Sequence, residues 1–123
     1  MEYKVTLTPK ARRDLATIWN YIARNDRDAA TTFCHNLAEQ AFSLRIFPER
    51  YFELPERRNV RKISYQSYLI FYEIHGDQHW VEILRFWHSA QDQRRLRLKE
   101  EPLAVYSVSP GAAPVTAQLE SSR

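Results

Sequence analysis

Residues 68–87 read YLIFYEIHGDQHWVEILRFW, two apolar runs separated by a short polar turn. The runs are 68–74 and 80–87, and His75-Gly76-Asp77-Gln78 lies between them. Gly76 can adopt the positive φ that a tight turn requires, so the segment predicts an antiparallel hairpin with Gly76 in that conformation. Each run is apolar at nearly every position, which predicts two strands that are covered on both faces.

The residues immediately before this hairpin predict one more strand and a loop. Val60-Arg61-Lys62-Ile63 starts a pattern of period two, which indicates a strand beside the hairpin. Residues 48–59 contain two prolines and several charges and follow no regular period, so we expect an ordered loop there.

Two amphipathic helices are expected nearer the N-terminus. Thr8 and Pro9 are a typical cap and first residue of a helix, and Asp14 lies early enough for its charge to suit the helix dipole. A second helix begins after a cap at Asp26 or Asp28 and is closed by Pro48. The short link 24–27 makes the two helices an antiparallel hairpin. The expected apolar stripes are Leu15, Ile18, Trp19 and Ile22 on the first helix, and Ala30, Phe33, Cys34, Leu37, Ala41, Leu44 and Phe47 on the second.

The chain opens with a pattern that predicts a short strand. Tyr3, Val5 and Leu7 alternate with polar residues, so one face of this strand is expected to be buried. The order of elements is then β-α-α-β-β-β. It predicts an α+β fold in which the helical hairpin packs on one face of a mainly antiparallel sheet.

A helical hairpin can cover only one face of such a sheet, although both strands of residues 68–87 are apolar on two sides. Two kinds of cover remain for the other face. Either residues 93–106 of the chain fold over it, or a second protein binds there, because large exposed apolar patches usually mark binding surfaces.

The bulk composition indicates one domain without a disulfide or a membrane span. We expect a domain over residues 1–101 and a polar, flexible tail over 102–123. Cys34 is the single cysteine and lies on the apolar stripe of the second helix, where it is best interpreted as a small core residue. No signal sequence or apolar run of membrane length occurs, so a cytoplasmic protein without membrane contacts is expected.

The net charge of +3 indicates only a weak preference for anionic partners. With two glycines in the chain, a glycine-rich phosphate loop is excluded. His75 and His79 bracket the turn, but the sequence offers no evident third ligand, so neither a metal nor a cofactor is expected. The basic residues gather in two runs, which are Arg57, Arg58, Arg61 and Lys62, and then Arg94, Arg95, Arg97 and Lys99.

Several segments, in this order and spacing, resemble the ParE/RelE superfamily of toxins from type II toxin–antitoxin systems, and the resemblance is closer to ParE. It covers about residues 3–93. The matching segments are LTPKARRDL at 7–15, ATIWNYI at 16–22, FPER at 47–50, VRKI at 60–63, YLIFY at 68–72, and VEILRFWH at 81–88 running on to Asp92.

The resemblance implies a toxin that a cognate antitoxin neutralises, and it implies one of two targets. ParE-type toxins poison DNA gyrase, whereas RelE-type toxins cut messenger RNA on the ribosome. In both types the antitoxin wraps around the toxin, and the complex contacts operator DNA through the antitoxin. An inactive member that only binds its antitoxin is a third possibility, motivated by the unusual extension beyond Pro102.

A ribonuclease site must remove a proton from a ribose hydroxyl, stabilise a phosphate and protonate a leaving oxygen. Arg61, Lys62, Arg85 and His88 are the candidate catalytic residues, with Glu73 as a base if it shares their face.

Another interpretation of the same residues needs no catalysis. Arg85 lies in an apolar strand and is expected to pair with Glu73 or Glu82, while His88 makes a capping or packing contact near Asp92. RelE-type sites also carry more lysine. We therefore favour a gyrase inhibitor whose target-binding surface contains Arg61, Lys62, Arg85, His88, Arg94 and Arg95, together with Arg97.

Overall fold

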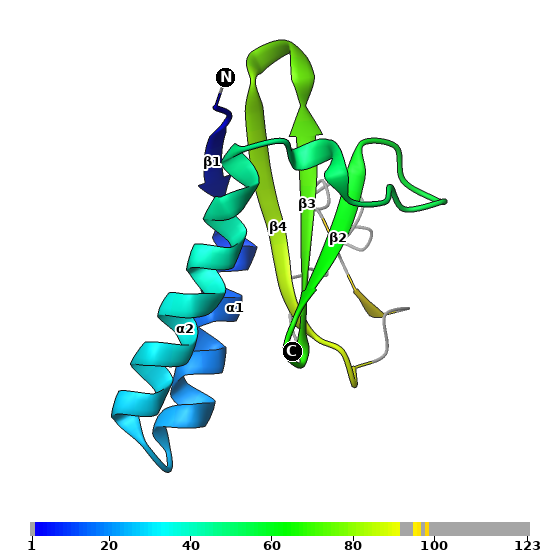
Figure 1. Ribbon diagram of the computed structural model, residues 1–123. Coiled ribbons are helices and arrows are strands. Elements are labelled where there is room, and N and C mark those ends of the chain that lie inside the picture. Colours follow the sequence, from blue (N-terminus) through cyan, green and yellow to red (C-terminus); the bar gives the residue numbers. More distant parts are fainter. Residues whose placement is uncertain (1, 92–94, 97, 99–123) are drawn as a thin grey trace, which may run out of the picture.

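A computed structural model describes residues 2–91, 95, 96 and 98, and confirms the predicted β-α-α-β-β-β order (Figure 1). The four strands form one sheet in the order β1-β4-β3-β2, in which only β1 runs parallel to its neighbour. No helix in this part of the chain has the length and apolar character needed to span a membrane. The elements are β1 (Lys4–Leu7), α1 (Pro9–Ala23), α2 (Arg27–Phe42), β2 (Val60–Tyr65), β3 (Tyr68–His75) and β4 (Trp80–His88), with single 3-10 turns at Ser43–Arg45, Pro48–Arg50 and Gly76–Gln78.

The two helices begin where the sequence predicts. The Thr8 hydroxyl accepts a hydrogen bond from the amide of Ala11 at 3.1 Å, and Pro9 is the first residue of α1. Asp26, one of the two expected caps, accepts from the amide of Ala29 at 3.0 Å at the start of α2. Both helices lie on one side of the sheet, as Figure 1 shows.

Two local predictions were wrong. The expected second helix stops at Phe42, and Phe47 leaves its apolar stripe with a left-handed φ of 51° and an exposed ring. The residue before a proline avoids right-handed helical angles, so the helix could not include Phe47, and it already gives way to the 3-10 turn at Ser43–Arg45. In the turn between β3 and β4, the positive φ belongs to His79 and not to Gly76. Gly76 begins a 3-10 turn, so the residue with positive φ is His79, three positions later, and the His79 ring stacks on Tyr3 with a centroid distance of 4.3 Å.

The sheet separates two hydrophobic clusters. The larger one lies between the helices and the sheet, and includes Ile18, Leu37 and Tyr72. The second, which we call the far-face cluster, lies on the other side of the sheet. Its members are Val60, Leu69, Phe71, Leu84, Trp87 and Leu98, with Leu54 and Leu96 packed against them.

The far-face cluster shows what covers part of the second face of the sheet. Leu96 and Leu98 come from the C-terminal side of β4, so residues of the chain itself contribute some of the cover. The predicted tail 102–123 lies outside the described residues, as does most of the segment 93–106.

One irregularity in the sheet shapes the region of the candidate site. Phe71 pairs with Arg85 and Tyr72 pairs with Ile83, so Leu84 has no partner of its own on β3. An extra residue of this kind is a β-bulge, which bends its strand and re-aims the neighbouring side chains. Beyond this point no other strand of the described residues pairs with the outer edge of β4, because β1 pairs only with Trp80–Ile83; we call this part the free edge of β4.

Candidate functional site

Asp14 and Arg85 form the central ion pair of the candidate site. The Arg85 Nε lies 2.7 Å from Asp14 Oδ2, and its terminal nitrogen lies 2.9 Å from Oδ1, an arrangement with two parallel bonds. Asp14 Oδ2 also accepts a hydrogen bond from the amide of Phe86 at 3.0 Å. The side chains of Asp14 and Arg85 are about 15% exposed, so the pair is largely removed from water.

This pair corrects two predictions. Asp14 is not in the first turn of α1, where no acidic residue occurs, and its carboxylate binds β4. Arg85 pairs with Asp14, whereas Glu73 and Glu82 lie beside His75. The bulge at Leu84 accounts for the difference, because the extra residue changes the alternation of side chains along β4.

His88 makes the packing and capping contacts that the sequence predicted as the alternative to catalysis. It pairs with Tyr68 across the strands, and the two rings meet edge to face with a centroid distance of 5.0 Å. Its Nδ1 accepts a hydrogen bond from the amide of Ala90 at 3.0 Å, where the chain turns after β4. Asp92, the other half of the expected motif, lies outside the described residues.

Arg85 and His88 line one groove of about 400 Å³ between α1 and the free edge of β4. Asp14 and Tyr68 belong to the same groove, as does Tyr21, whose side chain is 65% exposed. Burial raises the pKa of the Tyr68 hydroxyl, with smaller contributions from Cys34 and Tyr21, so this phenol stays protonated at neutral pH. We call this feature the Arg85–His88 groove.

Arg61 and Lys62 lie elsewhere. Both belong to β2, which is separated from β4 by β3. The Arg61 guanidinium donates to the backbone carbonyls of Tyr51 and Glu49 in the loop before β2. Lys62 lines a different hollow, and Arg95 is exposed. Of the predicted site residues, the structure therefore brings together Arg85 and His88. Arg61 and Lys62 lie apart from them on β2. Arg94 and Arg97 lie outside the described residues.

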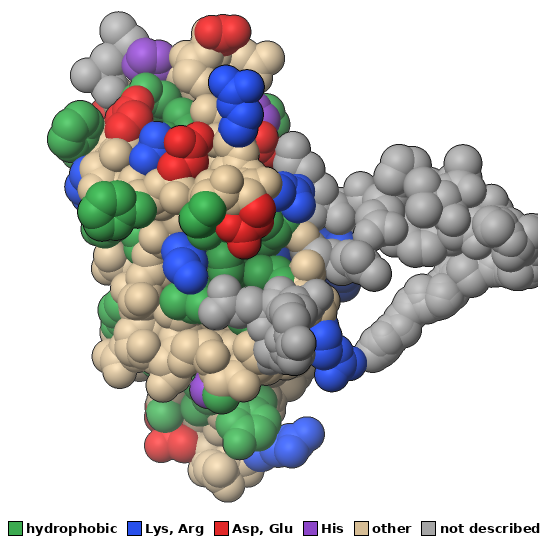
Figure 2. Space-filling model, turned by 90° about the vertical axis from the view of Figure 1, so that its right-hand side faces the viewer, with side chains coloured by type: hydrophobic (Ala, Val, Ile, Leu, Met, Phe, Trp, Pro, Cys, Tyr) green, Lys and Arg blue, Asp and Glu red, His purple; other side chains and the backbone are tan. Residues whose placement is uncertain are grey.

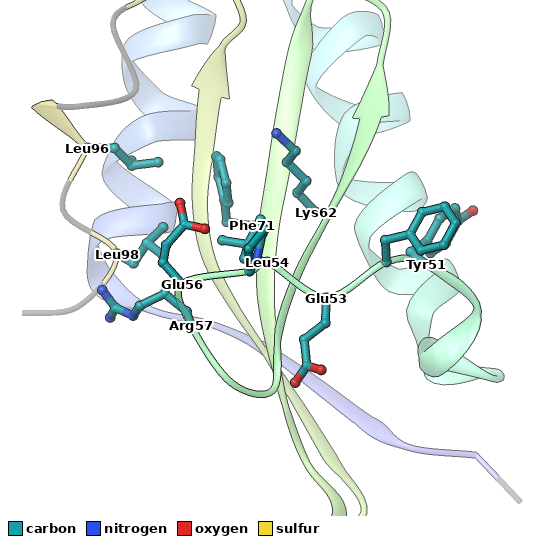
Figure 3. Close-up of a pocket in the computed structure, with 11 residues that line it drawn as sticks. Tyr51, Glu53, Leu54, Glu56, Arg57, Lys62, Phe71, Leu96 and Leu98 are labelled. Carbon is teal, nitrogen blue, oxygen red and sulfur yellow. The ribbon is translucent and has the colours of Figure 1, made fainter.

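The hollow next to Lys62 has a volume of about 660 Å³ and lies on the far face of the sheet (Figure 3). Phe71 and Leu54 line it together with Leu96 and Leu98, whereas Lys62 and charged loop side chains stand at its rim. Figure 2 views the molecule from this side and shows hydrophobic side chains between acidic and basic ones. We call this feature the far-face hollow.

Glu73 and the histidines of the turn are placed differently from the predictions. Glu73, considered as a catalytic base, lies beside His75 and Glu82 and not in the Arg85–His88 groove. His75 therefore has two carboxylates as neighbours, which the sequence analysis missed. Glu73 pairs directly with Glu82 across β3 and β4, so a prediction of the hairpin register could have placed these two carboxylates next to each other.

The structure agrees with the interpretation of Cys34 as a small core residue. It packs against the larger hydrophobic cluster, and its thiol lies 3.8 Å from the carbonyl oxygen of Leu15. Burial raises the pKa of the Cys34 thiol, which disfavours the reactive thiolate.

Comparisons with known proteins agree with this architecture. The family model described as the ParE toxin of the type II toxin–antitoxin system parDE matches residues 5–93. No curated protein sequence matches the chain. A toxin–antitoxin complex, RelBE2 from Mycobacterium tuberculosis, contains a chain with 26% identity and a TM-score of 0.55; the match covers 72% of this chain and 99% of that one. The chromosomal ParDE system of P. aeruginosa contains another, with 21% identity, a TM-score of 0.61, and coverage of 71% and 96%.

Proposed function

The chain belongs to the ParE toxin family of type II toxin–antitoxin systems, and from this premise we propose that it inhibits DNA gyrase by binding, without catalysis of its own. The observation that carries the proposal is the dispersal of its basic side chains. Of the four candidate catalytic residues, Arg61 and Lys62 lie on β2, while Arg85 and His88 lie in a groove beside α1.

The contacts of these residues support a structural role over catalysis. Both carboxylate oxygens of Asp14 hold the Arg85 guanidinium, so much of its positive charge is already neutralised. The Nδ1 of His88 is engaged by the amide of Ala90, and the Arg61 guanidinium is engaged by two carbonyls. A phosphate in a cleavage reaction needs cations that converge on it. Among the described residues, these four do not converge.

We further propose that a cognate antitoxin is the physiological partner. Both similar structures named above are toxin–antitoxin systems. The far-face hollow supports this proposal, because its apolar lining of Phe71, Leu54, Leu96 and Leu98 suits an apolar peptide side chain. Contact with operator DNA would then occur through the antitoxin.

Purified full-length protein, freed from antitoxin, tests the gyrase proposal. We expect inhibition of gyrase supercoiling and accumulation of cleaved plasmid at protein concentrations comparable to that of the enzyme, because a binding inhibitor acts stoichiometrically. Ribosomes programmed with messenger RNA serve as the parallel assay. No effect on gyrase at excess protein, together with cleavage of the RNA, would refute the proposal.

A RelE-like ribonuclease is the second candidate, and the presence of both Arg85 and His88 in one groove favours it. Under this alternative, His88→Ala and Arg85→Ala would abolish RNA cleavage on the ribosome while antitoxin binding persists. If both variants cleave RNA as the unmodified chain does, these residues are not the catalytic site.

A further inference from the structure

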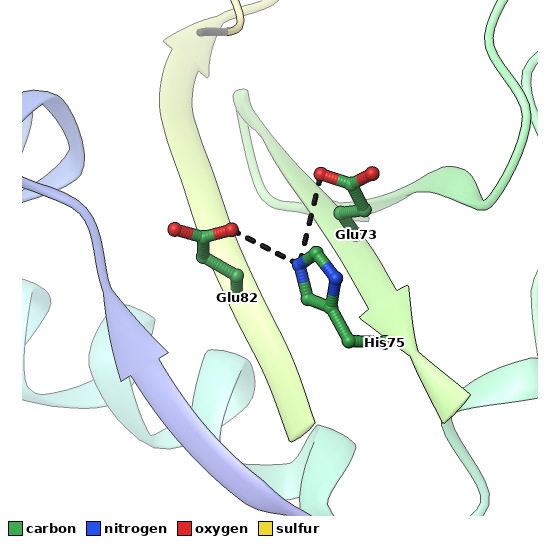
Figure 4. Close-up of side chains that lie close together, drawn as sticks. All are labelled: Glu73, His75 and Glu82. Atoms are coloured by element: carbon green, nitrogen blue, oxygen red, sulfur yellow. Dashed lines mark hydrogen bonds and ion pairs between the residues drawn. The ribbon is translucent and has the colours of Figure 1, made fainter. Parts of the chain in front are cut away.

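At the turn end of the β3–β4 hairpin, Glu73 and His75 of β3 point toward Glu82 of β4 (Figure 4). We propose that these three side chains, which we call the Glu–His–Glu cluster, form a binding site for a Zn²⁺ ion. No member of the cluster is among the four residues whose positions carry the gyrase proposal. Arg85 and His88 lie beyond the bulge at Leu84 from Glu82, whereas Arg61 lines a hollow together with His75.

The distances within the cluster suit a small divalent cation. His75 Nε2 lies 3.1 Å from Glu82 Oε1 and 3.8 Å from Glu73 Oε1, and one ligand atom from each residue can be chosen so that all lie within 4.8 Å of one another. Zinc binds imidazole nitrogen and carboxylate oxygen at about 2.0–2.2 Å, so neighbouring ligands of a tetrahedral ion are separated by roughly 3.4 Å. Small side-chain rotations would bring the three atoms to that spacing.

The electrostatics of the hairpin also favour a cation at this position. Glu73 and Glu82 are direct partners across the two strands, and like charges placed opposite each other destabilise a sheet. Both carboxylates are partly withdrawn from water, with side chains 13% and 26% exposed, so water screens their repulsion only partly. A divalent ion coordinated by both carboxylates would be attracted to each of them, and the imidazole of His75 would exchange its hydrogen bond to Glu82 for a bond to the ion.

The cluster is held in place before any ion binds. All three residues are in strands of one antiparallel pair, which fixes their backbones. The His75 ring stacks on Trp80 with a centroid distance of 4.4 Å, and the Trp80 indole donates to the Thr6 hydroxyl at 2.7 Å. Pre-organised ligands lose little conformational freedom on binding, which increases affinity.

The ligand types select the metal. One imidazole with two carboxylates suits zinc and its first-row neighbours, whereas Ca²⁺ and Mg²⁺ prefer oxygen ligands alone. Three protein ligands would leave one tetrahedral position for water. The His75 side chain is 28% exposed, so solvent can reach the ion. Because the ligands come from both strands, the bound ion would clamp the turn end of the hairpin.

Titration of the chelator-treated, full-length protein with zinc chloride tests the proposal. We expect one ion per chain by calorimetry and a higher unfolding temperature at saturating zinc, because the ligand binds the folded state. Glu82→Gln and His75→Asn should weaken binding by on the order of 10- to 100-fold or more, since even the loss of residues that only support metal ligands has effects of this size. Co²⁺ should give visible absorption bands in the unmodified chain that His75→Asn removes.

His79→Asn and Asp77→Asn are the matched controls, because Asp77 lies within the same turn and His79 directly after it, and both are outside the cluster. They should bind zinc as the unmodified chain does, and circular dichroism should verify that every variant is folded. The proposal is overturned if the unmodified chain binds no zinc at 100-fold molar excess. Equal affinity of the Glu82→Gln, Glu73→Gln and unmodified proteins would also overturn it, as would tighter binding of Ca²⁺ or Mg²⁺ than of Zn²⁺.

Discussion

At the scale of single residues, partners far apart in the sequence determine what the charged side chains of the site do. Asp14 and Arg85 are separated by 71 positions, and their spacing in the sequence contains no sign of the pairing. His88 was easier to interpret, because a histidine at a strand end before a turn has backbone amides within reach. Its predicted capping contact is present, whereas the ion pair of Arg85 with Asp14 was not among the predictions.

The Asp14–Arg85 pair should contribute measurably to stability. Asp14→Ala removes two bonds to a guanidinium and one to a backbone amide, and leaves a mostly buried positive charge. We expect a loss of about 2–3 kcal/mol in the free energy of unfolding, measured with urea. Glu2→Ala, which removes the exposed Glu2–Arg45 pair at 3.9 Å, should cost at most about 0.5 kcal/mol. Equal effects of the two changes would contradict the structure.

Tyr72 should make the protein sensitive to alkali. Burial raises the pKa of its hydroxyl, an effect that outweighs the opposing influence of Arg61 and Arg50, while free tyrosine ionises near pH 10. The unfolded chain then loses this proton first, so stability is fully present below about pH 10 and falls above it.

Tyr72→Phe should reduce the alkaline slope by up to about 1.4 kcal/mol per pH unit. It should also cost about 1 kcal/mol at neutral pH, since the hydroxyl donates to the carbonyl of Pro48. Urea unfolding between pH 8 and 11.5 measures both effects. Tyr21→Phe is the control because its side chain is largely exposed. An unchanged alkaline limb in Tyr72→Phe would show that this hydroxyl is not the cause.

At the scale of elements, local rules predicted the helices and strands well and their ends less well. The helix starts at Pro9 and near Asp26 follow from capping chemistry, which involves neighbours only three residues apart. The end of α2 at Phe42 and the bulge at Leu84 depend on packing between elements, and so no local pattern indicated them.

The two helix caps should differ in importance. Asp26→Ala removes one capping bond and should cost about 1 kcal/mol. Thr8→Ala should cost more, about 1.5–2.5 kcal/mol, because the Thr8 hydroxyl also donates to the carbonyl of Leu84 on the free edge of β4. Chemical unfolding of both variants gives the comparison. A cost for Thr8→Ala no greater than that for Asp26→Ala would argue against the second bond.

At the scale of the whole molecule, the sheet has two apolar faces, as the sequence predicted, and residues on both sides of it contribute cover. The helices cover one face, while Leu54, Leu96 and Leu98 pack on the other. The sequence left open whether the chain or a partner supplies that cover, because a strand covered on both faces has the same apolar sequence in either case. The far-face hollow shows that the described residues still leave space there.

Leu98 should therefore contribute to the stability of the free chain. It is 7% exposed within the far-face cluster, so Leu98→Ala should cost about 2 kcal/mol or more in the free energy of unfolding. Leu96→Ala should cost less, because Leu96 is only partly buried. Urea unfolding of both variants without antitoxin measures this difference, and an unaffected Leu98→Ala variant would show that the residue does not cover the sheet.

Gyrase inhibition by the His88→Ala variant tests most directly whether the chain acts without chemistry. In purified gyrase assays, we expect this variant still to inhibit supercoiling and trap cleaved plasmid at concentrations comparable to that of the enzyme or moderately higher. His88 would then be one of several binding contacts and, packed against Tyr68 and capping a turn, would take part in no reaction. A folded variant that loses all activity, while the unmodified chain inhibits at far below the enzyme concentration, would contradict a mechanism based on binding alone.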